Sequence, residues 1–157
     1  MHTTFENIDV RKFLPHRPPM LMVDKLITLN DKIVETQFVV PKNCIFLNKT
    51  TFVEAGLIEN MAQTCSIILG CSYFFDDDGL KENNSNVIGF ISSIKSLHVF
   101  KLPVVKDTLL TKGKIISRID GKDYSICEME SEIISNGKTI LSSNLNLFIK
   151  KNNHEGK

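Results

Sequence analysis

The chain has 157 residues, of which 42% are hydrophobic and 24% are charged. This length fits one domain with its own core, and the composition is that of an ordinary globular protein, which excludes a disordered or fibrous chain. The formal net charge is only +1, from 19 basic and 18 acidic residues. Because so balanced a charge provides no field that would hold a polyanion, we expect no nucleic-acid partner.

The cysteines and the start of the chain bear on metals and on the cellular compartment. No Cys-x-x-Cys pair and no histidine at zinc-ligand spacing occurs among Cys44, Cys65, Cys71 and Cys127, so we expect no metal. Residues 1–19 lack the basic start and apolar run of a secretory signal. Polar side chains interrupt the longest apolar stretch, residues 55–75, which argues against a membrane span. These features together predict a reduced, cytoplasmic protein.

The first part of the chain predicts two strands after a stiff, extended segment. Residues 13–19 contain three prolines, which fix the backbone and disfavour a helix. Residues 20–29 have the composition of a strand, and a turn follows. Residues 34–40 alternate apolar with polar side chains, which is typical of a half-buried strand.

After residue 50 the pattern changes to a helical period. Thr51 and Glu54 have the spacing of a capping box, in which each side chain binds a free backbone N–H. Apolar residues then recur at helical spacing, namely Phe52, Ala55, Ile58, Met61, Ala62, Cys65, Ile68 and Leu69. The pattern predicts a helix of roughly five turns that is apolar around most of its girth and therefore central.

The rest of the chain predicts a polar loop and four strands. The loop covers residues 76–86, and the strands cover residues 87–99, 109–118, 124–134 and 140–149. Asp-Gly at residues 120–121 and Asn-Gly at residues 136–137 are strong hairpin signals, so the last three strands should form an antiparallel meander. Two strands, one helix and four strands predict an α+β fold in which an antiparallel sheet wraps around one long helix. Unpaired edge strands favour dimerisation by continuation of the sheet.

Three motifs, in this order, resemble the β-hydroxyacyl-acyl-carrier-protein dehydratases of the FabA/FabZ type. Residues 14–25 are similar to the family's Leu-Pro-His-Arg-x-Pro opening, and residues 56–63 to its central-helix motif, with Glu-x-Met-Ala-Gln. Residues 88–105 are similar to its strand that ends in Phe-Lys-x-Pro-Val. The resemblance covers about residues 11–149 and implies a single hotdog domain, residues 1–157, that works as a homodimer or larger assembly.

The resemblance also implies an activity. The family eliminates water from a 3-hydroxyacyl thioester on acyl carrier protein and gives a trans-2-enoyl thioester, without metal or other cofactor. Its histidine removes the α-proton and its helix glutamate, which corresponds to Glu59, helps the hydroxyl to leave. Counting back from Glu59 by the family's spacing leads to Ile45, and residues 43–50 contain no histidine. In this departure the chain resembles a divergent branch of dehydratase-like proteins that accompany aryl-polyene, flexirubin and related polyketide synthesis.

The candidate site centres on Glu59, because a carboxylate on the apolar face of a central helix is costly to bury unless it is paired. Gln63 follows one turn later on the same face and could bind this carboxylate or a substrate carbonyl. Asn60 points elsewhere, toward another strand, a partner subunit or the substrate. The backbone N–H of Ala55 or Gly56 could bind the thioester oxygen, and Gly56 would let an acyl chain approach the helix.

Two residues are candidates for the base that replaces the missing histidine. His16 belongs to the opening motif, a stretch that is mainly structural in the family. Cys44 stands beside the position where the histidine would fall, and its thiol would need a lowered pKa to act as a base.

Two other functions are compatible with the same motifs. The chain could be a non-catalytic or assisting subunit that pairs with a complete hotdog dehydratase, which the missing histidine favours. It could also be a hotdog thioesterase in which Glu59 activates water. An enoyl thioester, a free acid, or no product from the chain alone would distinguish the three functions.

Overall fold

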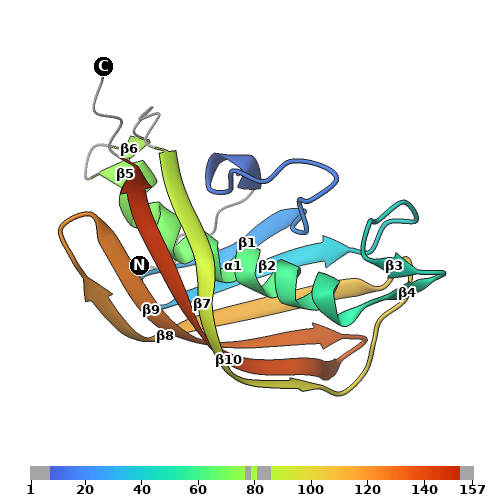
Figure 1. Ribbon diagram of the computed structural model, residues 1–157. Helices are drawn as coiled ribbons and strands as arrows, with labels where there is room; N and C mark the ends of the chain where they lie inside the picture. Colours follow the sequence, from blue (N-terminus) through green and yellow to red (C-terminus); the bar gives the residue numbers. More distant parts are fainter. Residues whose placement is uncertain (1–7, 77–78, 81–85, 153–157) are drawn as a thin grey trace.

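The computed structural model describes residues 8–76, 79–80 and 86–152. Six antiparallel strands form one sheet that curves around helix α1 (Glu54–Phe74) in the order β1-β2-β8-β9-β10-β7 (Figure 1). The strands are β1 (Lys25–Leu29), β2 (Ile33–Val39), β7 (Asn86–Val99), β8 (Thr108–Asp120), β9 (Tyr124–Ser135) and β10 (Lys138–Asn152). The predicted α+β arrangement is confirmed.

Three smaller elements complete the fold. A short 3-10 helix, η1 (Val10–Lys12), precedes the proline-rich segment. A small hairpin of β3 (Leu47–Asn48) and β4 (Thr51–Phe52) leads into the helix. A second one, β5 (Phe75–Asp76) with β6 (Gly79–Leu80), follows the helix within the predicted polar loop, of which residues 77–78 and 81–85 lie outside the described residues.

The strand predicted over residues 20–29 is wrong in its first half, because β1 begins only at Lys25. The N–H groups of Met20 and Leu21 instead bond to the carbonyl of Arg17 in a turn. The next residue, Met22, is bonded through its main chain to side chains of α1 and not to a strand. An apolar run that reads as a strand is therefore a segment that packs directly on the helix.

The predicted capping box is also wrong. Thr51 lies in β4, where it pairs with Asn48 and forms a bridge with Val104. The helix begins three residues later, and the carbonyl of Val53 accepts the N–H groups of Gly56 and Leu57 at 3.0 and 3.2 Å. Strand pairing has displaced the helix start that the side-chain pattern predicts.

The predicted meander of the last three strands is confirmed, since β8 pairs with β9 and β9 with β10. The turn between β9 and β10 holds Asn136 at φ 51° and Gly137 at φ 72°. Two consecutive residues in the left-handed region form the two-residue turn whose twist matches that of the strands. The Asn-Gly pair therefore sets the register of this hairpin.

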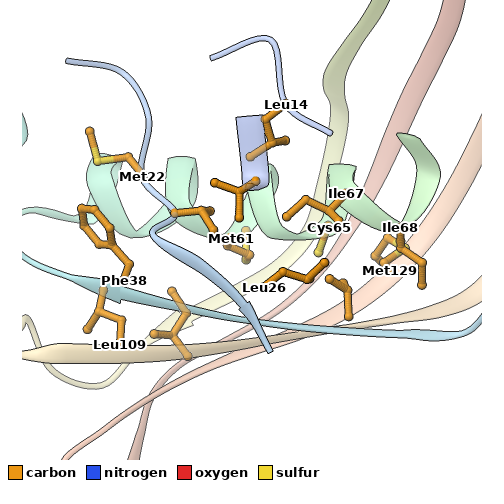
Figure 2. Close-up of a cluster of buried hydrophobic side chains, with 14 of the residues drawn as sticks. Leu14, Met22, Leu26, Phe38, Met61, Cys65, Ile67, Ile68, Leu109 and Met129 are labelled. Atoms are coloured by element: carbon orange, nitrogen blue, oxygen red, sulfur yellow. The ribbon is translucent and has the colours of Figure 1, made fainter. Parts of the chain in front are cut away.

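Helix and sheet enclose one apolar core. Met61 and Cys65 of α1 lie in the same buried cluster as Leu109 of β8 and Met129 of β9 (Figure 2). Cys65 is fully buried, and this burial raises the pKa of its thiol to about 12, so this cysteine is a core residue. No helix in the described part of the chain is both long and apolar enough to cross a membrane.

The close approach of α1 to the sheet predicts a stability effect at Gly113 of β8. A Cβ at this position would lie 2.8 Å from Cys65 Sγ and 3.1 Å from Val34 Cγ1. We therefore expect Gly113→Ala to lower the free energy of unfolding by about 1–3 kcal/mol, the usual cost of overpacking a core. Urea unfolding measures this change.

Gly89→Ala in β7 is the matched control, because the nearest atom to its added Cβ is Ile149 Cγ1 at an ordinary 3.4 Å. Equal unfolding midpoints for the two variants would show that the helix does not press on Gly113.

Candidate active site on the central helix

The side chain of Gln63 fixes the Glu59 carboxylate. Its Nε2 donates to Glu59 Oε1 at 2.7 Å and to the carbonyl of Met20 at 2.8 Å, while its Oε1 accepts the N–H of Met22 at 2.8 Å. The predicted bond between the two side chains, one turn apart on α1, is thereby confirmed. The same amide binds the helix to the segment that precedes β1.

His16 lies beside Glu59. Its Nε2 is 3.6 Å from Glu59 Oε1, and both side chains are partly exposed, at 32% and 27%. Arg17 holds the loop in place, because its Nη1 donates to the carbonyls of Leu14 and His16, both at 2.8 Å. The other ring nitrogen of His16, Nδ1, is buried and has no hydrogen-bond partner in the described structure.

The Asn60 side chain is fully buried and directed toward β8, as predicted. Its Nδ2 donates to the carbonyl of Met22 at 2.6 Å, and its Oδ1 accepts the hydroxyl of Thr111 at 2.6 Å. Both ends of the amide are thus bonded to the chain itself, and this geometry lends no support to a substrate contact. Asn60 and Gln63 together satisfy both main-chain polar groups of Met22.

At the start of the helix, the backbone N–H groups of Ala55 and Gly56 differ in whether they are already hydrogen-bonded. The N–H of Gly56 donates to Val53, so it is not free to bind a substrate oxygen. A Cβ at Gly56 would lie 2.5 Å from the Phe52 ring and 2.7 Å from Phe46 Cβ, so the glycine admits these aromatic rings and not an acyl chain. The N–H of Ala55 has no partner within the described residues, and this exposed residue lies one turn before Glu59.

Cys44 occupies a different place. It lines a cleft of about 260 Å³ between residues 18–24 and residues 38–44, where its Sγ lies 3.8 Å from Met22 Sδ. Neither Glu59 nor His16 lines this cleft, so Cys44 is not brought to the pair. In the described ranges, no three His, Cys, Asp or Glu side chains gather as a metal site would require.

The Glu59 carboxyl group and the Ala55 N–H lie one turn apart on α1, and the His16 imidazole, from the segment before β1, lies beside Glu59. Carboxyl and imidazole groups are the usual acids and bases of enzymes near neutral pH. A free N–H at a helix N-terminus can bind a developing negative charge on oxygen. The site is therefore suited to proton transfer next to a carbonyl group.

A curved antiparallel sheet around one central helix defines the hotdog fold. The model of the ApeP-like family, described as ApeP dehydratase, matches residues 8–155, so the chain belongs to this family. The chain is 28% identical, over 143 aligned residues, to the 3-hydroxyacyl-[acyl-carrier-protein] dehydratase FabZ of Helicobacter pylori J99, covering 79% of this chain and 87% of the relative. The FabZ of Chlamydia muridarum is 27% identical, with 83% and 86% covered.

Solved structures share the fold. A chain of the dehydratase heterocomplex ApeI:P from Xenorhabdus doucetiae superposes with a TM-score of 0.70 at 20% identity and covers 95% of this chain and 94% of its own length. A hypothetical thioesterase from Streptococcus pneumoniae, solved with coenzyme A, gives a TM-score of 0.59 at 16% identity, with 81% and 85% covered.

The bonds of Gln63 predict a large effect of Gln63→Leu. The substitution leaves the Met22 N–H and the Met20 carbonyl without their partner, and unpaired buried groups are expensive. We expect the free energy of unfolding to fall by about 2–4 kcal/mol, as measured by urea denaturation.

Gln37→Leu in β2 serves as the control, since the Gln37 side chain makes no hydrogen bond in the described part of the chain. If both variants lost the same stability, the opening segment would not depend on Gln63.

Proposed function

We propose that this chain is a dehydratase of 3-hydroxyacyl thioesters, with Glu59 as the group that transfers the proton. The observation that carries the proposal is the 3.6 Å separation of Glu59 Oε1 and His16 Nε2 within one chain. Membership of a dehydratase family supports the elimination of water as the reaction. The family's spacing would put the histidine at position 45, where this chain has Ile45. His16 instead supplies the polar group beside the carboxylate.

The reaction breaks two bonds on adjacent carbons, the α C–H and the β C–O. Groups that act on adjacent carbons must themselves lie close together, as Glu59 and His16 do. Negative charge develops on the thioester oxygen when the α-proton leaves. The free N–H of Ala55 is suited to bind that oxygen, because backbone donors at a helix start stabilise such a charge.

The acyl group would be delivered on acyl carrier protein. Lys42, Lys49 and Lys106 come together near the start of α1, because the Lys106 N–H bonds to the carbonyl of Val40 and the Val105 N–H to that of Thr50. None of these ammonium groups forms an ion pair within the described residues. Unpaired positive charge beside the site suits a carrier with an acidic surface.

A second candidate function is an assisting subunit of a hotdog hetero-oligomer. Among the described residues, the edge strand β7 has β10 as its single sheet neighbour. Its Ile88, Phe90 and Ile94 are 47%, 51% and 40% exposed. An open, apolar edge favours pairing with another sheet. The partner would be a second copy or a complete dehydratase, and the related ApeI:P structure is a heterocomplex.

The proposal predicts the product of the purified chain with a 3-hydroxyacyl thioester on acyl carrier protein. Intact mass should fall by one water, and Glu59→Gln should slow this loss by at least about 100-fold, the usual contribution of an acid or base. Glu54→Gln is the matched control, because Glu54 is an exposed residue in the first turn of the same helix.

Release of the free acid would instead indicate a thioesterase. Dehydration that occurs only after a second hotdog protein is added would indicate the assisting subunit. Full activity of Glu59→Gln would contradict the assignment of the site.

The lysines near the helix start predict a selective effect on the carrier. We expect Lys42→Glu with Lys106→Glu to raise the KM for the carrier-bound substrate about three- to tenfold, because each surface pair contributes up to about 1 kcal/mol. The KM for the same acyl group on N-acetylcysteamine should stay unchanged.

Lys114→Glu, an exposed lysine of β8, is the charge-matched control. A double variant that is impaired equally on both substrates would contradict docking of the carrier at these lysines.

A further inference from the structure

We propose that His16 stays neutral during the reaction and acts as a hydrogen-bond donor, while Glu59 alone carries the proton. This inference rests on the proposed dehydration and assigns the roles within its site. It differs from a division of work in which histidine is the base and glutamate the acid. The surroundings of the two ring nitrogens of His16 carry the argument.

The buried nitrogen determines the tautomer. A neutral imidazole carries one N–H and one acceptor nitrogen, whereas the charged ring carries two N–H groups. Nδ1 of His16 is buried and has no partner in the described structure, so a proton there would be a buried donor without an acceptor. Leaving the donor unpaired costs free energy. Nδ1 is unpaired in either tautomer, but a proton on Nε2 faces the Glu59 carboxylate, which can accept it, whereas a proton on Nδ1 would leave the Nε2 lone pair facing that carboxylate. The proton therefore resides on Nε2.

The same surroundings oppose a role as base. To take a proton on Nε2, the ring must first carry its own proton on Nδ1, and it then becomes a cation with Nδ1–H still unpaired. Catalytic histidines usually give that second N–H to a carboxylate or carbonyl. Among the described residues, Glu59 is the acidic side chain that lies beside the His16 ring, and it lies next to Nε2 and not Nδ1. The neighbouring Arg17 side chain donates to the carbonyl of His16. A guanidinium group has no acceptor, so it cannot pair with a proton on Nδ1 of His16.

The spacing leaves room for a substrate hydroxyl. The 3.6 Å between Nε2 and Oε1 exceeds a normal hydrogen bond, and an oxygen atom placed to one side of the pair can lie about 2.8 Å from both Nε2 and Oε1. A β-hydroxyl there would accept the Nε2–H of His16 and touch the carboxyl of Glu59. Gln63 holds Oε1 of that carboxyl, and Oε2 has no hydrogen bond within the described residues. Oε2 is thus the oxygen available to the α-proton.

The atoms balance with a single proton carrier. Oε2 of Glu59 takes the α-proton, and the electron pair of the C–H bond forms the double bond. The C–O bond breaks toward the β-oxygen, which takes the proton back from the Glu59 carboxyl and leaves as water. Glu59 is again ionised, and His16 has donated a hydrogen bond throughout without losing its proton.

Two amides of different length test the role of His16. The side-chain nitrogen of Gln reaches the place of Nε2 and can donate but cannot act as a base, whereas Asn is too short. We expect His16→Gln to keep kcat within about tenfold of the wild type, and His16→Asn and His16→Ala to lose at least about 100-fold. The KM should change little, since the bond is strongest as the hydroxyl leaves. A His16→Gln variant as inactive as His16→Asn, with both folded by circular dichroism, would overturn the proposal.

Nitrogen-15 NMR of the imidazole rings gives a readout that does not depend on activity. His16 is assigned as the signal that disappears in His16→Gln. The proposal predicts that the His16 ring of the wild-type chain carries its proton on Nε2. A ring protonated on Nδ1, or on both nitrogens, would overturn it even if dehydration is established, and an Nε2–H ring in a chain without activity would count against the proposed function alone.

Discussion

The structure depends on the bonds that hold the opening segment to the central helix. Gln63 and Asn60 take the N–H and the carbonyl of Met22, the two groups that a strand would give to a neighbour. Without these side chains the main chain of a buried segment would be unpaired, which proteins rarely tolerate. Because Gln63 also holds Glu59, one amide fixes both the carboxylate and the segment that brings His16 beside it.

Fold and chemistry separate clearly in this protein. The hotdog architecture follows from the apolar helix, the small Gly113 beneath it and the turn at residues 136–137, and none of these features performs proton transfer. The site is a small addition to this scaffold, as is usual for folds that carry several activities. In this member of the ApeP-like family, the segment before β1 places the imidazole of His16 beside the helix glutamate Glu59.

Much of the fold could be predicted, because it depends on local patterns. Alternation and turn residues predict the strands of the meander, and the change of period predicts the helix. The prediction of a strand over residues 20–29 is wrong in its first half because the main chain of Met22 bonds to side chains far away in the sequence. His16 is a candidate base on the sequence and does lie beside Glu59, but its distance and orientation could not be predicted because no local spacing connects the two residues. The packing at Gly56 could not be predicted either, because the Phe52 ring beside it lies on the preceding hairpin.

Subunit complementation tests most directly the central claim that one chain supplies both groups. Glu59→Gln and His16→Ala chains, each inactive alone, are co-expressed with different tags and the mixed assembly is purified and assayed for dehydration. A site built within one chain predicts that the mixed assembly stays inactive, since every site then lacks one group. Recovery of about half the wild-type activity per assembly would contradict the account, because it would require His16 of one subunit to act with Glu59 of the other.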